Sequence, residues 1–134
     1  MIWQDVVVRL PLGDEVLASG LAAGFGVTPE AVLVHRGAAD FPERGDAKIV
    51  CVVSERAEGF RSVMSLYTFL DSHLGDDPVT VVKRFAQAAG TACLLSDDSP
   101  DPYSMILIGA TGEVVRVNID VELLDAKGEY HLKD

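Results

Sequence analysis

The sequence has no uninterrupted apolar run near twenty residues, the length that a helix needs to cross a bilayer, so no membrane span is expected. Residues Met1 to Asp5 lack the basic segment and longer apolar stretch of a secretory signal, so export is not predicted. Only two cysteines occur among 134 residues, which indicates a reducing cytoplasm. A chain of this size buries enough surface to fold without disulfides or a structural metal, and we expect one domain over residues 1–134.

Basic residues are scarce. The chain has 11 Lys and Arg against 21 Asp and Glu, a formal net charge of −10. Residues 1–70 carry 6 basic and 9 acidic residues, whereas residues 71–134 carry 5 and 12, so most of the negative charge lies in the second half. Such a field repels phosphate backbones and makes nucleic acid an unfavourable ligand. It favours a basic protein partner, although acidity also serves solubility alone.

Motifs that would mark an enzyme or a cofactor site are missing. The glycines form neither a dinucleotide fingerprint nor a phosphate loop, and no Ser or Cys lies in a nucleophile elbow. Cys51 and Cys93 lie inside apolar strands, where core packing is expected. His35, His73 and His131 lack the spacing of a zinc site. We therefore predict no catalytic, cofactor-binding or metal-ligating residue, although an enzyme built from scattered residues would look the same.

The apolar run at 105–108 and the alternating run at 115–121 are joined by a linker with Gly109 and Gly112, and they predict a β-hairpin over 103–121 at the centre of the sheet. In the second arm, apolar and polar residues alternate and lie on opposite faces of the strand. The apolar face carries Val115, Val117, Ile119 and Val121, and the polar face, which should be exposed to solvent, carries Arg116, Asn118 and Asp120.

The remaining chain alternates strand and helix signals. Strands are expected at 5–10, 31–34, 47–54 and 91–95, the second with a one-turn helical entry, and the alternating Tyr130 and Leu132 are compatible with a short edge strand within 122–132. Residues 60–69 fit a strand or a helix, and their Ser, Thr, Val and aromatic content favours the strand. Helices should follow caps at Asp14 and Asp77. This order predicts an α+β fold, with two helices on one face of a largely antiparallel sheet: a ferredoxin-like core with an added C-terminal hairpin.

An acidic loop precedes the hairpin, and the charged residues Glu122, Asp125 and Glu129 follow it. The loop lacks the spacing of a calcium site, so a solvated loop is expected. Together with the solvated face of the hairpin, these carboxylates could frame a patch around Tyr103 or Tyr130, since a tyrosine often anchors an interface. The predicted partner-binding residues are Asp97, Asp98, Asp101, Tyr103, Arg116, Asn118 and Asp120.

Residues 90–98, the stretch Pro102-Tyr103-Ser104 and residues 111–114 resemble the C-terminal half of small acidic bacterial immunity-type proteins, which neutralise toxin domains by binding them. Together with the acidic charge and the low cysteine count, the resemblance leads us to expect a non-enzymatic, cytoplasmic binding protein, an immunity or antitoxin-like inhibitor of a basic partner. The sequence leaves two alternatives open. One is a small enzyme or small-molecule-binding domain, and the other is a structural module that pairs sheet edges, for example as a homodimer.

Overall fold

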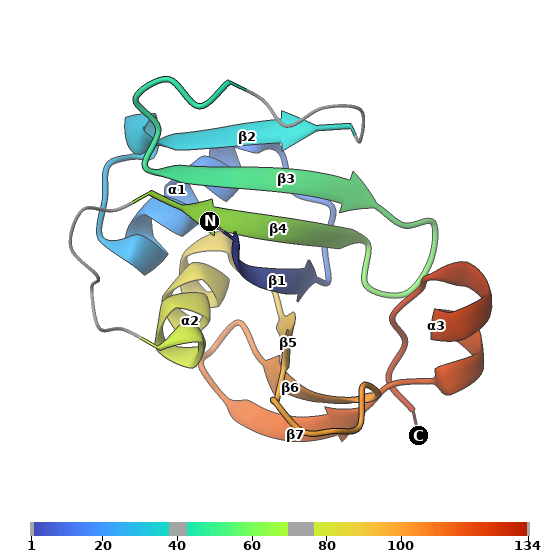
Figure 1. Cartoon of the computed structure of the whole chain (residues 1–134). Coiled ribbons are helices and arrows are strands. Elements are labelled where there is room, and N and C mark those ends of the chain that lie inside the picture. Colours follow the sequence, from blue (N-terminus) through green and yellow to red (C-terminus); the bar gives the residue numbers. More distant parts are fainter. Residues whose placement is uncertain (1, 38–42, 70–76, 134) are drawn as a thin grey trace.

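The computed structural model describes residues 2–37, 43–69 and 77–133 and shows an α+β fold built on one mixed, seven-stranded sheet (Figure 1). The strand order is β2-β3-β4-β1-β5-β6-β7, and only β2 and β3 pair in parallel. The strands are β1 (Ile2–Val8), β2 (Val32–Arg36), β3 (Ile49–Glu55), β4 (Ser62–Thr68), β5 (Cys93–Ser96), β6 (Ser104–Ile108) and β7 (Val114–Asn118). The helices are α1 (Asp14–Phe25), the 3₁₀ turn η1 (Pro29–Ala31), α2 (Pro78–Ala89) and α3 (Val121–Lys127).

Strand β1 lies at the centre of the sheet, between β4 and β5. Its three consecutive valines, Val6, Val7 and Val8, are at most 2% exposed, because both faces of the sheet are covered there. The prediction that the hairpin over 103–121 forms the centre is therefore wrong. The hairpin exists as β6 and β7, but β7 is an edge strand. Residues 60–69 contain strand β4, as their composition favoured.

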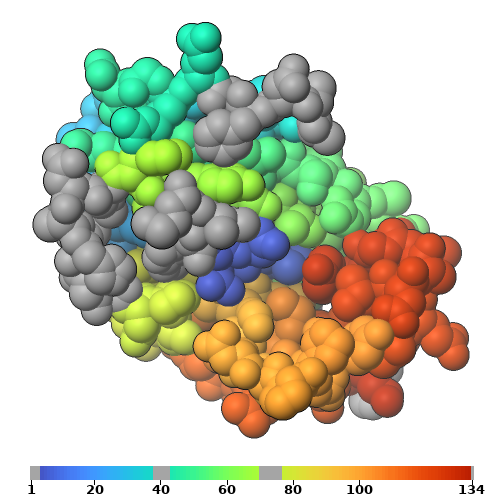
Figure 2. All heavy atoms as spheres, viewed as in Figure 1, coloured from blue at the N-terminus to red at the C-terminus, as the bar shows by residue number. Residues whose placement is uncertain are grey.

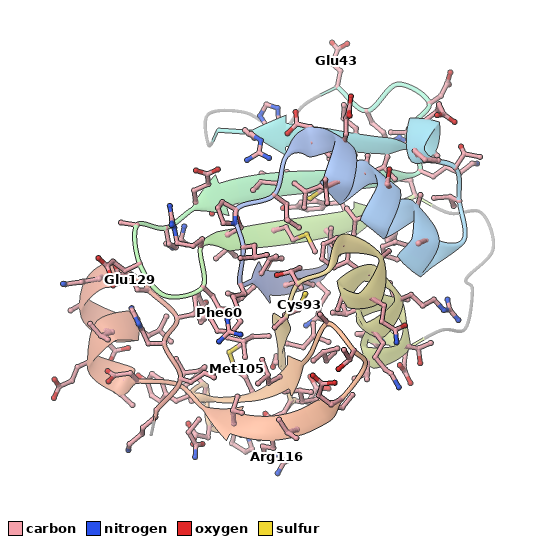
Figure 3. The ribbon with its side chains drawn as sticks, turned by 180° about the vertical axis from the view of Figure 1, so that it is seen from behind. Glu43, Phe60, Cys93, Met105, Arg116 and Glu129 are labelled. Carbon is pink, nitrogen blue, oxygen red and sulfur yellow. The ribbon has the colours of Figure 1, made fainter. Side chains whose placement is uncertain are left out.

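Helices α1 and α2 cover one face of the sheet, as Figure 3 shows from the helix side. Along β3, the alternate residues Ile49, Cys51 and Val53 point into the core beneath these helices. The two helices approach closely at Gly20, where an added Cβ would lie 2.8 Å from a ring carbon of Phe85. The small residues of α1 therefore allow a close helix–helix contact, and Phe85 fills the space left by the missing side chain.

The helix starts follow the expected chemistry with one adjustment. Asp77 caps α2 by accepting a 2.7 Å hydrogen bond from the Thr80 amide, and this bond lowers the pKa of the Asp77 carboxyl. Pro78 occupies the first position of α2. In α1 the cap position belongs to Gly13, and Asp14 lies in the first turn, where its charge still suits the helix dipole. The one-turn entry to β2 is present as η1.

The second face of the sheet is covered in part by α3 and the chain that follows it. The edge strand expected within 122–132 is wrong, because residues 121–127 are helical. Asp120 caps this helix by accepting a 3.0 Å hydrogen bond from the Leu123 amide, and Gly128 ends it with a positive φ of 66°. Of the expected pairing there remains a single bridge between Ile119 and Leu132.

A second core lies between this segment and the sheet. It contains Val7, Phe60, Leu94, Met105 and Ile119. Residues Leu124, Tyr130 and Leu132 pack against it, so the C-terminal segment is tied to the middle of the sheet. Within the described residues the structure thus has three α-helices, besides the 3₁₀ turn η1, where two helices were expected. Among the described residues, no helix is long and apolar enough to cross a membrane. Residues 38–42, which follow β2, and residues 70–76, which precede α2, lie outside the described residues.

Candidate functional site

The predicted binding residue Asp97 supports the loop from inside. Its side chain is 1% exposed and accepts hydrogen bonds from the Ser104 hydroxyl and, at 2.9 Å, from the Ser99 amide. The Arg116 guanidinium lies 3.4 Å away. These contacts, the Ser104 hydroxyl first, hold the pKa of the Asp97 carboxyl below its usual range. Asp97 therefore holds the β5–β6 loop against β6 and β7.

The next carboxylates of the loop have different surroundings. Asp98 is exposed and adopts a positive φ of 63°, which Asp tolerates better than most residues. Asp101 accepts a 2.9 Å hydrogen bond from the amide of Tyr103. The Tyr103 hydroxyl in turn lies 2.9 and 3.0 Å from the two carboxylate oxygens of Asp125 in α3, and this contact raises the pKa of the tyrosine. The loop and α3 are thereby joined by one tyrosine.

The predicted patch is divided between the two faces of the hairpin. Arg116 is paired with Ile106 in the register, and it shares the face that α1 and α2 cover elsewhere in the sheet. Figure 3 shows it projecting from the edge strand. Asn118 lies on the same face as Arg116, whereas Tyr103 reaches α3 on the other face. Asp120 is occupied as a helix cap. The seven predicted residues therefore do not form one binding surface.

A groove of about 470 Å³ lies on the second face of the sheet, where β1, β5 and β6 meet α3. In Figure 2, β1 reaches the surface between the 97–101 loop and α3. The apolar lining comes from the second core, and Gln4, Asp5 and Ser96 supply polar groups. Among the described residues that line the groove, none is basic. The full lining is Gln4, Asp5, Val7, Ser96, Pro102, Met105, Leu124 and Tyr130.

Polar side chains of three neighbouring strands lie near one another here. Asp5 of β1 and Ser96 of β5 line the groove, and Ser65 of β4 is paired with Asp5 without belonging to the lining. Each of the three residues lies two positions along its strand from a residue that packs in the second core, and alternate side chains of a strand point to the same face, so all three lie on the face of the second core. Asp5 is exposed, and no side chain in the described part of the chain makes an ion pair with it. A carboxylate near two hydroxyls can accept hydrogen bonds from a cationic group.

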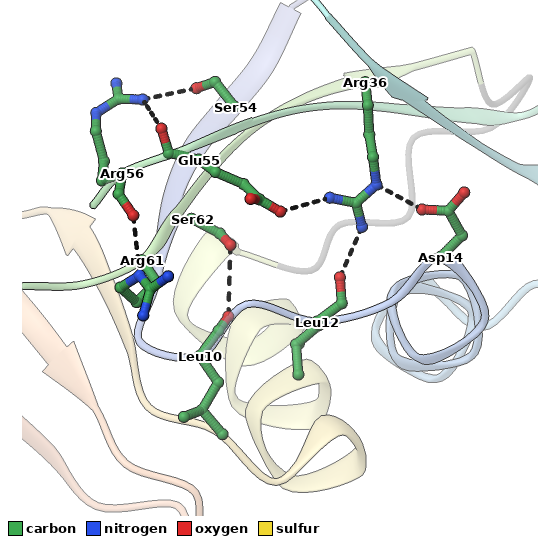
Figure 4. Close-up of polar contacts among 9 residues, drawn as sticks. All are labelled: Leu10, Leu12, Asp14, Arg36, Ser54, Glu55, Arg56, Arg61 and Ser62. Carbon is green, nitrogen blue, oxygen red and sulfur yellow. Dashed lines mark hydrogen bonds and ion pairs between the residues drawn. The ribbon is translucent and has the colours of Figure 1, made fainter. Parts of the chain in front are cut away.

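A second groove, of about 700 Å³, lies at the ends of β2 and β3 and is lined by Arg36, Gly37, residues 52–55 and Ser65. Arg36 is already occupied there. It donates hydrogen bonds to Asp14 at 2.7 Å, to Glu55 at 3.2 Å and to the carbonyl of Leu12 at 2.6 Å (Figure 4). This guanidinium holds the start of α1 to the ends of β2 and β3. Because the two carboxylates neutralise its positive charge, it has little attraction left for an anionic ligand.

Residues with catalytic potential are dispersed. Cys51 and Cys93 are fully buried, and burial raises the pKa of each thiol to about 12, so the nucleophilic thiolate is scarce at neutral pH. His131 lies 3.1 Å from Glu129, and His35 lies on β2; His73 lies outside the described residues. Within ranges 2–37, 43–69 and 77–133 no three His, Cys, Asp or Glu residues are placed to hold a metal ion.

Sequence reasoning missed Asp5, Ser65 and Ser96, although Tyr130 was expected to contribute to a binding surface. The signal was weak, because Asp5 precedes three valines and reads as the polar start of a buried strand. Only the pairing of β1 with both β4 and β5 brings the two serines near it.

Comparison of the chain with protein-family models, with curated proteins and with solved structures finds no match.

Proposed function

We propose that this protein is a non-enzymatic binding module that engages a basic protein partner through its second face, as an immunity or antitoxin-like inhibitor does. The groove between β1, β5, β6 and α3 carries the proposal. It combines an apolar floor with the acidic residue Asp5 and has no basic residue in its described lining. An apolar centre with a charged rim is typical of protein interfaces.

Acidic residues around the groove support the same partner. Asp98 and Asp101 of the loop are exposed, as are Glu122 and Asp125 of α3, and both segments border the groove through Pro102 and Leu124. Complementary rim charges accelerate association and discriminate against wrong partners more than they add affinity. Asp97 and Asp120 have internal roles, and Asp101 and Asp125 also accept hydrogen bonds from Tyr103, so Asp98 and Glu122 are the carboxylates that we expect a partner to meet most directly.

The ferredoxin-like core is the scaffold in this proposal. The order β3-β4-β1-β5, with α1 and α2 on one face, supports it. Strands β6 and β7 extend this core on one side, and β2 extends it on the other. The added hairpin and α3 then form one wall of the groove on the face opposite to the two helices.

The test is capture from the native lysate at low and high salt, followed by affinity measurement with the partner identified. A variant with Asp98→Asn and Glu122→Gln removes two exposed rim charges. Asparagine also tolerates positive φ, and glutamine suits a helix. We expect about a three- to tenfold loss of affinity at low salt and a weaker salt dependence, because exposed charge pairs contribute about 0.2–1 kcal/mol each.

The matched control is Glu15→Gln with Glu30→Gln. These two residues are also exposed, but they lie in α1 and η1 on the helix side of the molecule, and the control changes the net charge equally. It should bind as the unmodified protein does. If both variants weaken binding equally, net charge rather than this face governs association. If the captured partner is acidic, the proposal is wrong.

A second candidate function, self-association, is favoured by the edge strand β7. Val114 and Val115 are 42% and 49% exposed there, and an edge strand offers unpaired backbone groups. Arg116, whose side chain is 73% exposed, counters it as a charge on the same edge. Sedimentation velocity over a concentration series separates the candidates, since a strand-paired dimer would sediment faster as concentration rises, and Val115→Lys would abolish that change.

A further inference from the structure

We propose that the groove receives a lysine side chain of the partner, with its ammonium group held above Asp5 and its aliphatic stem on the apolar floor. This inference rests on the proposed function and specifies the chemistry that the groove recognises. Its recognition element is Asp5 of β1 rather than the carboxylates of the acidic loop and α3.

Polar side chains of three strands provide the acceptors. Ser65 of β4 is paired with Asp5 on the same face, and Ser96 of β5 lines the groove together with Asp5. An ammonium group has three donors and no acceptor, and the Asp5 carboxylate and these hydroxyls offer acceptors to it. The Ser96 hydroxyl oxygen already accepts from the Asp98 amide at 3.3 Å and keeps a second lone pair.

The apolar floor of the groove is complementary to the aliphatic stem of a lysine side chain. Val7 and Met105 are 2% and 8% exposed, and with Leu124 and Tyr130 they form the apolar part of the lining. Lysine buries its methylene stem along such surfaces while its charged head stays at a polar rim. Arginine fits this arrangement less well, because its planar fork gains most from a bidentate carboxylate rather than from separate acceptors. The predominance of carboxylates over basic residues in the chain adds charge complementarity.

The experiment titrates the isolated ¹⁵N-labelled protein with N-acetyl-lysine N-methylamide and follows amide chemical shifts. We expect saturable shifts at Asp5, Ser65, Ser96 and Met105 with a Kd on the order of 1–10 mM, the range for a weak ligand of about fourteen heavy atoms. The norleucine derivative, which keeps the stem and lacks the ammonium, should bind at least about fivefold more weakly. The arginine derivative should also bind more weakly.

The variant Asp5→Asn should weaken binding of the lysine derivative about fivefold, and the control Glu30→Gln, an exposed residue of η1, should leave it unchanged. Equal binding to both variants, equal binding of the norleucine derivative, or shifts that do not saturate would overturn the inference. Tighter binding of the arginine derivative would overturn the choice of lysine, and tighter binding of spermidine would overturn a side-chain ligand.

The outcome is independent of the capture experiment. If the lysine derivative binds saturably but no basic partner is captured from the lysate, the proposed function is refuted and the groove is a binding site for cations. If a basic partner is captured and its affinity is unaffected by Asp5→Asn, the lysine inference is refuted and the proposed function stands.

Discussion

The replacement Ile119→Ala tests whether the second core holds the wall of the groove in place. Ile119 is 0% exposed, belongs to that core and follows β7 directly. Its amide donates a 2.8 Å hydrogen bond to the carbonyl of Tyr103, and it bridges to Leu132. The replacement removes three carbons, worth about 0.8 kcal/mol each in transfer free energy. With the cavity left behind, we expect the free energy of unfolding to fall by about 3 kcal/mol.

Val115→Ala is the matched control, because Val115 points to the same face of the hairpin but is 49% exposed. It removes two carbons that are only half buried, so the expected loss is about 0.8 kcal/mol. Urea unfolding followed by circular dichroism measures both variants. Hydrogen exchange gives a local reading at the amides of Asp120 and Lys133, which donate 2.8 Å bonds to the carbonyls of His131 and Asn118.

In Ile119→Ala these two amides should exchange faster than the global loss of stability requires, because the segment that forms the groove wall is freed locally. In Val115→Ala the protection of these two amides against exchange should fall only as much as the small loss in the free energy of unfolding requires. Equal losses in the two variants would refute the reasoning. So would unchanged local protection, since it would show that α3 and the C-terminal segment are held by something other than this core.

Three further predictions concern charge, thiol chemistry and helix packing. The pKa of Asp97 is lowered in the folded state, so the stability that its ionised carboxylate contributes is complete above the ordinary pKa of 3.8 and is lost as the pH falls through the folded pKa. The difference in the free energy of unfolding between the unmodified protein and Asp97→Asn, measured by urea unfolding from pH 7 to pH 3, should therefore become smaller toward acidic pH. The thiols of Cys51 and Cys93, with pKa values raised to about 12, should resist iodoacetamide at pH 8 and react only when urea unfolds the chain; rapid native alkylation would contradict their burial. Gly20→Ala should lower the free energy of unfolding by about 1 kcal/mol despite better helix propensity, because the new Cβ lies 2.8 Å from the Phe85 ring; a gain in urea stability would mean that the ring moves aside.

Local signals predicted most of the elements. The alternation of Ile49, Cys51 and Val53 gave both the strand and its buried face, and Asp77 with Pro78 marked the start of α2. These features depend on residues within a few positions of one another. The last helix was missed for a related reason. Asp120 was assigned to the solvated face of a strand, although its carboxylate caps the next helix, and a short segment supports either interpretation until the Gly128 end is weighed.

The position of the hairpin could not be obtained in this way. A dense apolar run such as Met105 to Ile108 indicates burial on both faces, and β6 satisfies this between the helices and the second core without lying at the centre. The central place belongs to β1, whose valines are a shorter run. The order of strands is set by long-range pairing, so the strength of an apolar signal does not rank strands from centre to edge.

The same limit explains why the candidate site moved from the loop to the sheet. The cluster of Asp97, Asp98 and Asp101 is conspicuous in the sequence. Turns, however, need side-chain acceptors for their own amides, and in this loop Asp97 and Asp101 accept hydrogen bonds from such amides. Asp5 is inconspicuous, but a strand supplies hydrogen bonds through its backbone and leaves its outward side chains free. An exposed carboxylate on a central strand beside an apolar groove has less of a structural reason to be there than one in a tight loop. For this reason Asp5, rather than the more acidic loop, is the residue whose neutralisation should most specifically alter recognition.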